Sequence, residues 1–203
     1  MGEPLASIAY YDDLAARLAP TYDSISFEQA NAGIGPYLPA APARVLDVGA
    51  GSGRDARALA AMGHDVMAVE PSEAFRSIAA AADAGVAWID DRLPDLPGVT
   101  SLGMRFDFIL CSAVLMLIPL TQLGRTFETL SRLLTNPGRL AVTLRAPVGT
   151  EPRDVFHAHS DEDVVRSAAA AGLDAVKRAM PDDALGRQAL RWRSYVFERV
   201  RLR

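Results

Sequence analysis

A glycine-rich turn between a strand-like run and a helix-like run constrains the fold of this chain most. Residues 45–55 read VLDVGAGSGRD, with glycines at Gly49, Gly51 and Gly53. Glycine lacks a Cβ, so it adopts the left-handed backbone easily and lets a ligand lie against the main chain. A tight turn alone does not require three alternating glycines. The pattern therefore predicts a ligand-binding loop between a strand and a helix.

Strand-like and helix-like segments alternate on both sides of this turn. Two helices are expected before it, one over residues 5–19 that ends at Pro20 and one that begins at Ser24 or Ser26 and runs toward Leu38. Five β-rich runs follow at 44–48, 65–70, 86–89, 106–111 and 139–145. Helical runs separate or follow them at 55–62, 72–83, 121–134 and 160–172.

Two strands without an intervening helix, at 173–180 and 191–200, close the chain and are expected to pair as an antiparallel hairpin at one edge. The near-continuous apolar strands are typical of a sheet that helices cover on both faces. We predict an α/β fold with a doubly wound, seven-stranded, Rossmann-like sheet, mostly parallel. Because 203 residues, half of them hydrophobic, suit one core, we expect a single domain, with a helical lid over 1–40 and the core over 41–203.

Charge and cysteine content limit the partners. With 21 basic and 25 acidic residues the net charge is −4, so DNA is not expected as a partner and RNA is disfavoured. The single cysteine, Cys111, lies in an apolar run and is expected to be buried and reduced. No basic segment followed by an apolar stretch opens the chain, and the apolar run 108–120 is too short to span a bilayer. We expect a cytoplasmic protein that does not bind membranes.

Spacing around the glycines distinguishes between nucleotide ligands. A dinucleotide fingerprint would place its third glycine at position 54, which is Arg54. Glu70, roughly 20 residues beyond the turn at the end of the next strand, is placed to accept both hydrogen bonds of a ribose diol. A carboxylate at Asp47 would repel a pyrophosphate but suits the ammonium group of an amino acid. This favours S-adenosylmethionine over NAD.

The segment VLDVGAGSGRDARALAAMGHDVMAVEPS resembles the first motif, second strand and acidic residue of the class I S-adenosylmethionine-dependent methyltransferase superfamily. The resemblance extends from about Asp13 to Glu198. It implies S-adenosylmethionine as cofactor and S-adenosylhomocysteine as product. The cofactor-binding residues that we predict are Tyr22, Asp47, Gly49, Ala50, Gly51, Gly53, Glu70, Pro71, Asp90, Asp91, Arg92, Ser112 and Ala113.

The resemblance also implies roles within this set. The glycine-rich turn would wrap the methionine part and Glu70 would hold the ribose. A carboxylate after the third strand would meet the adenine amino group, and Asp90 and Asp91 both qualify, with Asp91 slightly preferred. The fourth strand, FDFILCSAVLMLIP, would pass near the sulfonium. Some relatives have a polar residue or histidine where this chain has Leu117, which argues against a general base there and leaves the catalytic residues unassigned.

Other candidates are weaker. The N-terminal helices resemble the family's lid, and Tyr22 is favoured over Tyr10, Tyr11 and Asp23 for contact with cofactor or substrate. His157 and His159 have no further ligands at metal-binding spacing, so an exposed loop is expected rather than a metal site or a proton-transfer pair.

The arginines could bind a charged acceptor, or they could have no role in the site. Arg145 is expected to pair with a carboxylate rather than with an anionic acceptor. The C-terminal arginines, Arg187 to Arg203, are expected to form a solvated face.

We predict an S-adenosylmethionine-dependent methyltransferase acting on a small molecule, of unassigned oligomeric state. Three alternatives remain. The first is a methyltransferase of the same fold that acts on RNA or protein. The second is a nicotinamide-dependent oxidoreductase, which Arg54 and Asp47 disfavour. The third is an S-adenosylmethionine-binding protein without catalysis.

Overall fold

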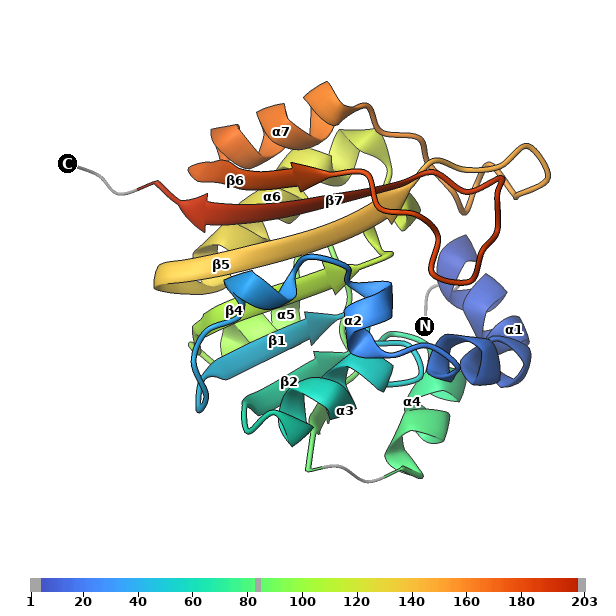
Figure 1. Ribbon diagram of the computed structural model, residues 1–203, viewed down its shortest axis with the longest axis horizontal. Coiled ribbons are helices and arrows are strands. Elements are labelled where there is room, and N and C mark those ends of the chain that lie inside the picture. Colours follow the sequence, from blue (N-terminus) through green and yellow to red (C-terminus); the bar gives the residue numbers. More distant parts are fainter. Residues whose placement is uncertain (1–4, 83–84, 201–203) are drawn as a thin grey trace.

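Seven strands form one mixed sheet in the computed structural model, which describes residues 5–82 and 85–200 (Figure 1). The strand order is β3-β2-β1-β4-β5-β7-β6. Strands β1 to β5 pair in parallel, and β7 runs antiparallel to both of its neighbours, β5 and β6. The predicted doubly wound sheet with an antiparallel C-terminal edge is confirmed. The strands are β1 (Arg44–Val48), β2 (Asp65–Val69), β3 (Ala87–Ile89), β4 (Phe106–Ser112), β5 (Leu134–Arg145), β6 (Leu173–Ala179) and β7 (Trp192–Arg199).

Helices cover both faces because side chains alternate along each strand. On β1, Val45 packs in the cluster that includes Phe27 of α2 and Leu59 of α3, whereas Leu46 packs in the cluster that includes Phe127 of α6. Figure 1 shows α2 and α3 in front of the sheet and α6 and α7 behind it. The helices are α1 (Ala6–Asp23), α2 (Phe27–Ala30), η1 (Gly35–Tyr37), α3 (Arg54–Ala61), α4 (Glu73–Ala80), α5 (Pro97–Ser101), η2 (Leu115–Leu117), α6 (Leu120–Leu133) and α7 (Asp161–Ala170).

The prediction that the first helix ends at Pro20 is wrong. Helix α1 continues through Pro20 to Asp23. Proline removes one backbone donor and normally ends or kinks a helix. Here the last turn is packed against α4, where the ring of Tyr22 stacks on that of Phe75 at 6.0 Å between centroids. Tertiary packing therefore outweighs the lost hydrogen bond.

The second predicted helix is also shorter than expected. Ser26 caps α2 in a reciprocal capping box with Gln29, as the sequence suggested, but the helix ends after four residues. Asn31 leaves the helical region, and its side chain donates instead to Asp55 and to the carbonyl of Phe27. The chain then reaches Leu38 through η1 rather than as one helix.

Strand β5 begins at Leu134, earlier than the predicted 139–145. Its pairing with β4 shifts from Phe106–Leu134 to Phe108–Arg139, so the turn residues 136–138 are accommodated as an irregularity inside the strand. The helix predicted over 72–83 ends at Ala80, and residue 83 lies outside the described residues. The short elements α5 and η2 were not predicted.

Helix α1 lies across one end of the sheet, against α4 (Figure 1). The carboxylate of Asp12 joins the two helices because its Oδ1 accepts from Ser72 Oγ at 2.6 Å and from the amide of Ala74 at 3.1 Å. This contact places α1 over the carboxyl ends of β1 and β2. Of the helices in residues 5–82 and 85–200, none is long and apolar enough to cross a membrane.

Candidate functional site

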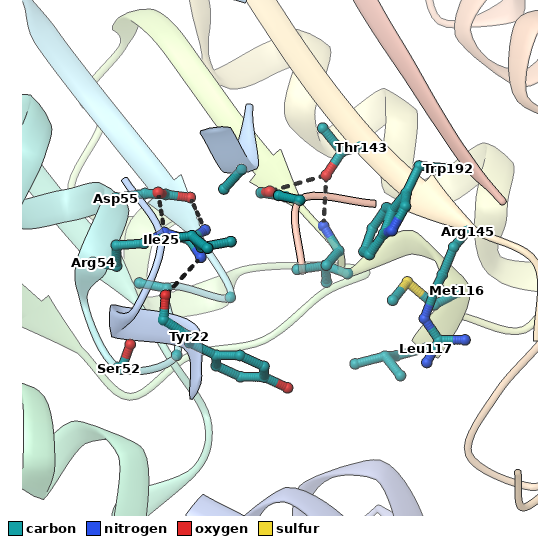
Figure 2. Close-up of a pocket in the computed structure, with 18 of the residues that line it drawn as sticks. Tyr22, Ile25, Ser52, Arg54, Asp55, Met116, Leu117, Thr143, Arg145 and Trp192 are labelled. Carbon is teal, nitrogen blue, oxygen red and sulfur yellow. Dashed lines mark hydrogen bonds and ion pairs between the residues drawn. The ribbon is translucent and has the colours of Figure 1, made fainter. Parts of the chain in front are cut away.

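A cavity opens at the carboxyl ends of β1, β2, β4 and β5, the edge where ligands bind in open α/β sheets (Figure 2). The loops after β1, β2 and β4 form one side. Helix α1 and the segment 181–192 between β6 and β7 form the other. Nine of the predicted site residues line this cavity: Tyr22, Asp47, Gly49, Ala50, Gly51, Glu70, Pro71, Ser112 and Ala113.

The glycine-rich turn has the conformation that its sequence requires. Gly49, Gly51 and Gly53 have φ of +72°, +54° and +83°. A Cβ on Gly49 would lie 2.3 Å from Cγ2 of Val114, so this position also needs glycine for close packing. A Cβ on Gly51 would meet no atom within 4 Å and would point into open space. The turn thus leaves room for a ligand against the backbone of Gly51.

Glu70 supports the turn from the neighbouring strand. Its Oε2 accepts from the amide of Gly51 and its Oε1 from the amide of Ser72, both at 2.8 Å. The residue is 7% exposed, and burial raises the pKa of its carboxyl group. Each carboxylate oxygen can accept a further hydrogen bond. Glu70 can therefore hold the turn and still receive the two hydroxyls of a ribose.

Asp47 is a buried carboxylate with an unsatisfied atom. It is 2% exposed, and its Oδ2 has no hydrogen-bond partner. Burial, together with the nearby Asp55 and Glu70 and against the opposing effect of Arg54, raises the pKa of Asp47 well above its usual range. An orphaned buried carboxylate is costly unless a cation or a donor reaches it. The acceptor oxygens at this end of the cavity thus fit an ammonium group beside a ribose, as in S-adenosylmethionine.

A chain of hydrogen bonds connects Asp55 to Thr143 beside the cavity; Figure 2 draws its two ends, the Arg54–Asp55 pair and the hydrogen bonds of Thr143. Arg54 holds Asp55 through two hydrogen bonds of 2.7 and 2.8 Å, and Asn31 Nδ2 donates to Asp55 at 3.0 Å. Ser112 Oγ donates to Asn31 Oδ1 at 3.0 Å and lies 2.9 Å from Thr143 Oγ1. Asn31 and Thr143 were not predicted, because neither belongs to a motif and their contacts depend on long-range packing.

The far part of the cavity, which we call the distal compartment, combines apolar and aromatic side chains with paired charges. Tyr11 and Tyr22 of α1 line it, and burial raises the pKa of both phenols, which favours their protonated form. The other residues that we assign to it are Met116, Leu117, Arg145, Asp183, Leu185, Arg187 and Trp192.

Four predicted residues lie away from this main cavity. Gly53 caps α3 beside Trp88 and does not line it. Asp90 is exposed and pairs with Arg76 at 3.1 Å. Asp91 and Arg92 line a second cavity that shares Gly49 and Pro71 with the first.

Asp90 and Asp91, the two candidates for the adenine contact, differ in burial. Asp91 is buried, and its carboxylate accepts from the amides of Arg92 at 2.8 Å and Val99 at 2.9 Å. Asp91 therefore lines the second cavity, whereas Asp90 faces solvent.

The histidine loop differs from the expectation. His157 lines the second cavity, and the prediction of an exposed loop is wrong for His159, which is buried with Nε2 2.9 Å from the carbonyl oxygen of Leu115. The segment that follows β5 folds back onto η2. Because this contact is long-range, the local sequence does not predict it. Burial lowers the pKa of His159, which favours its neutral form.

Arg145 pairs with a carboxylate as predicted, but Arg187 lines the cavity and Arg193 is half-buried, so the C-terminal arginines do not all form the predicted solvated face. Arg145 pairs with Glu151 through both of its terminal nitrogens. Arg187 pairs with Asp183 at 2.7 Å, and Arg193 donates to the carbonyl of His159. Arg201 and Arg203 lie outside the described residues.

Comparison with known proteins agrees with this geometry. A family model described as a methyltransferase domain matches residues 45–138, and a search of curated proteins found no match. Among solved structures, the chain is similar to 1,6-didemethyltoxoflavin-N1-methyltransferase from Burkholderia thailandensis, with 20% identity and a TM-score of 0.67 over 98% of this chain and 93% of that one.

Two further structures are similar over nearly the whole chain. A TehB-like S-adenosylmethionine-dependent methyltransferase from Corynebacterium glutamicum has 19% identity and a TM-score of 0.66, covering 96% of this chain and 98% of that one. The cyclase SpnF has 14% identity and a TM-score of 0.69, covering 98% of both chains.

The sheet order and the position of the cavity define the Rossmann-like fold of class I methyltransferases. Residues 45–138 thus match a methyltransferase-domain model, and the fold of the chain is that of S-adenosylmethionine-dependent methyltransferases.

Proposed function

We propose that this enzyme transfers a methyl group from S-adenosylmethionine to a small-molecule acceptor bound in the distal compartment. The observation that carries the proposal is a single cavity that joins Glu70, Gly51 and Asp47 to that compartment. Helix α1 and the segment 181–192, both of the same chain, border it. These borders on two sides of the cavity support a small acceptor.

In this proposal each predicted contact has a physical task. Glu70 accepts the ribose hydroxyls, and Asp47 Oδ2 gains the partner that it lacks by meeting the ammonium group. Gly51 leaves the space that the methionine part requires. Asp91 and the amide of Arg92 lie at the adenine end, in the second cavity. Residues 1–40 then act as the lid and residues 41–203 as the core of one domain.

The cofactor supplies an electrophilic methyl group on a sulfonium. The remaining task of the protein is to place the acceptor in line with the sulfur–methyl bond at near-attack distance and to exclude water. Tyr22 and Met116 line the distal compartment and are suited to this positioning. The proposed contacts therefore require no metal ion.

Calorimetric titration with S-adenosylhomocysteine, beside NAD and NADP, tests the cofactor. Micromolar binding of S-adenosylhomocysteine alone is expected, and binding of a nicotinamide cofactor alone would refute the proposal. Release of S-adenosylhomocysteine from S-adenosylmethionine in the presence of pooled small molecules, but not of RNA or denatured protein, then tests the acceptor class. Strong binding without turnover on any acceptor would favour a binding protein without catalysis.

A further inference from the structure

Trp192 has a fixed place in the distal compartment. It is the first residue of β7 and pairs across the strands with Arg145 of β5, so both side chains stand on the same face of the sheet at its end. Thr143 and Ser194, the next pair on that face, also line the cavity. Figure 2 shows the Trp192 ring on the same side of the cavity as Arg145, Met116 and Leu117, with Tyr22 projecting toward them from the opposite side.

Asp183 orients this ring. Its Oδ1 accepts from the indole Nε1 of Trp192 at 2.7 Å, and its Oδ2 accepts from the amides of Leu185 at 3.2 Å and Arg187 at 2.8 Å. The guanidinium of Arg187 donates to both oxygens. The Asp183 side chain is only 5% exposed, and these donors hold the pKa of its carboxyl group well below its usual range. One carboxylate thus organises the segment 181–192 around Trp192.

The polar edge of the indole is therefore satisfied inside the protein, and its face remains for the cavity. An aromatic ring held in this way offers a flat apolar surface at little cost in conformational entropy. The thioether of Met116 also borders the compartment, and methionine packs well against aromatic rings. These walls suit a planar ligand better than a branched one.

The charges of the compartment point to an uncharged ligand. Arg145 is occupied by Glu151, and its guanidinium lies 5.1 Å from the centre of the Phe156 ring. Arg187 is occupied by Asp183. An anionic acceptor would have to separate one of these pairs, which is costly for partly buried ions. The carboxylate of Asp182, exposed at the rim, would repel it as well.

We propose that the acceptor is a planar, uncharged aromatic molecule that stacks on Trp192. This inference rests on the proposed function, because the stacking site adjoins the proposed cofactor site. It deepens that function by naming the class of acceptor and a residue that determines specificity. Asp183 acts through Trp192 and is a positioning residue.

Two probes with similar ring systems and different charges test this proposal. Isoquinoline is planar and carries no charge at mildly alkaline pH, and naphthalene-2-carboxylate has a similar fused ring system with a negative charge. Each is titrated into the protein saturated with S-adenosylhomocysteine, with tryptophan fluorescence as the readout. The Trp88→Phe variant leaves Trp192 as the only tryptophan, since the chain has two.

Isoquinoline is expected to quench the fluorescence of Trp192 in Trp88→Phe and to bind at least about tenfold more tightly than naphthalene-2-carboxylate. In Trp192→Leu its dissociation constant, measured by calorimetry, should rise by about tenfold, and in Trp192→Phe by roughly threefold, because a smaller ring still stacks. Asp183→Asn should weaken binding less than Trp192→Leu and broaden the Trp192 emission.

Equal affinity of isoquinoline for the native protein and Trp192→Leu would overturn the stacking role, as would tighter binding of the carboxylate. Titration with S-adenosylhomocysteine alone shows whether each variant is folded. If S-adenosylhomocysteine binds and isoquinoline does not, the acceptor class is wrong while the proposed function stands. If S-adenosylhomocysteine fails to bind the native protein, the proposed function itself is wrong.

Discussion

Asp47 carries a buried carboxylate oxygen that has no hydrogen-bond partner. Without a cation its ionised form is disfavoured, which is why its pKa is raised. A raised pKa means that the unfolded chain loses this proton at lower pH than the folded protein does. The free energy of unfolding is therefore reduced as the pH rises above the unfolded value of 3.8 and toward the folded pKa.

Asp47→Asn removes this penalty. We expect the ligand-free variant to have a higher melting temperature at neutral pH, by about 2–4 °C for each 1 kcal/mol regained, and no gain at acidic pH. Its affinity for S-adenosylhomocysteine should fall by about tenfold, because the ammonium group loses a charged partner. Differential scanning calorimetry and titration measure both effects. Asp65→Asn, at an exposed carboxylate, is the control, and a destabilised Asp47→Asn at neutral pH would contradict the argument.

Glu70→Gln tests the second carboxylate with little change of shape. The amide keeps one acceptor oxygen, so one of the amides of Gly51 and Ser72 loses its partner, and the proposed ribose contact loses its charge. We expect S-adenosylhomocysteine to bind about tenfold more weakly or worse, since hydrogen bonds to charged groups contribute about 1.5–3 kcal/mol. Asp90→Asn, at the exposed neighbour of Asp91, should bind normally. Equal losses in both variants would contradict the role of Glu70.

At the scale of elements, the lid helix depends on one side chain. Asp12 caps the N-terminus of α4 from α1. Asp12→Ala should lower the free energy of unfolding by about 1 kcal/mol and raise hydrogen exchange in α1. Asp13→Ala changes the adjacent, exposed carboxylate and should do neither. Unchanged exchange in α1 of Asp12→Ala would show that aromatic packing alone docks the helix.

The elements also show what the sequence can and cannot predict. Alternating patterns and glycine spacing are local, so the order of strands and helices, the C-terminal hairpin and the glycine-rich turn were predictable. The path of α1 through Pro20 was not, because the stacking of Tyr22 on Phe75 decides it from a distance. The same holds for Trp192, whose place in the cavity depends on its pairing with Arg145.

At the scale of the whole molecule, a cofactor bound between the sheet and α1 should stabilise the fold as a unit. A ligand that binds only the folded state adds RT ln(1 + [L]/Kd), which is about 2.7 kcal/mol at one hundred times Kd. For a chain of 203 residues this corresponds to a rise in melting temperature of about 5–10 °C. We expect this rise with S-adenosylhomocysteine and none with NAD.

Gly51→Val should abolish the shift, because its side chain would occupy the open space beside the turn. Its positive φ of +54° also strains any other residue, so the variant will be less stable even without ligand. Gly103→Val is the matched control: its φ is +64°, a Cβ there meets no atom within 4 Å, and it does not line the described cavities. Both variants should melt earlier than the native protein, but only Gly103→Val should keep the stabilisation by S-adenosylhomocysteine. If Gly51→Val kept it too, the ligand would not lie against this turn, and Glu70 and Asp47 would need another explanation.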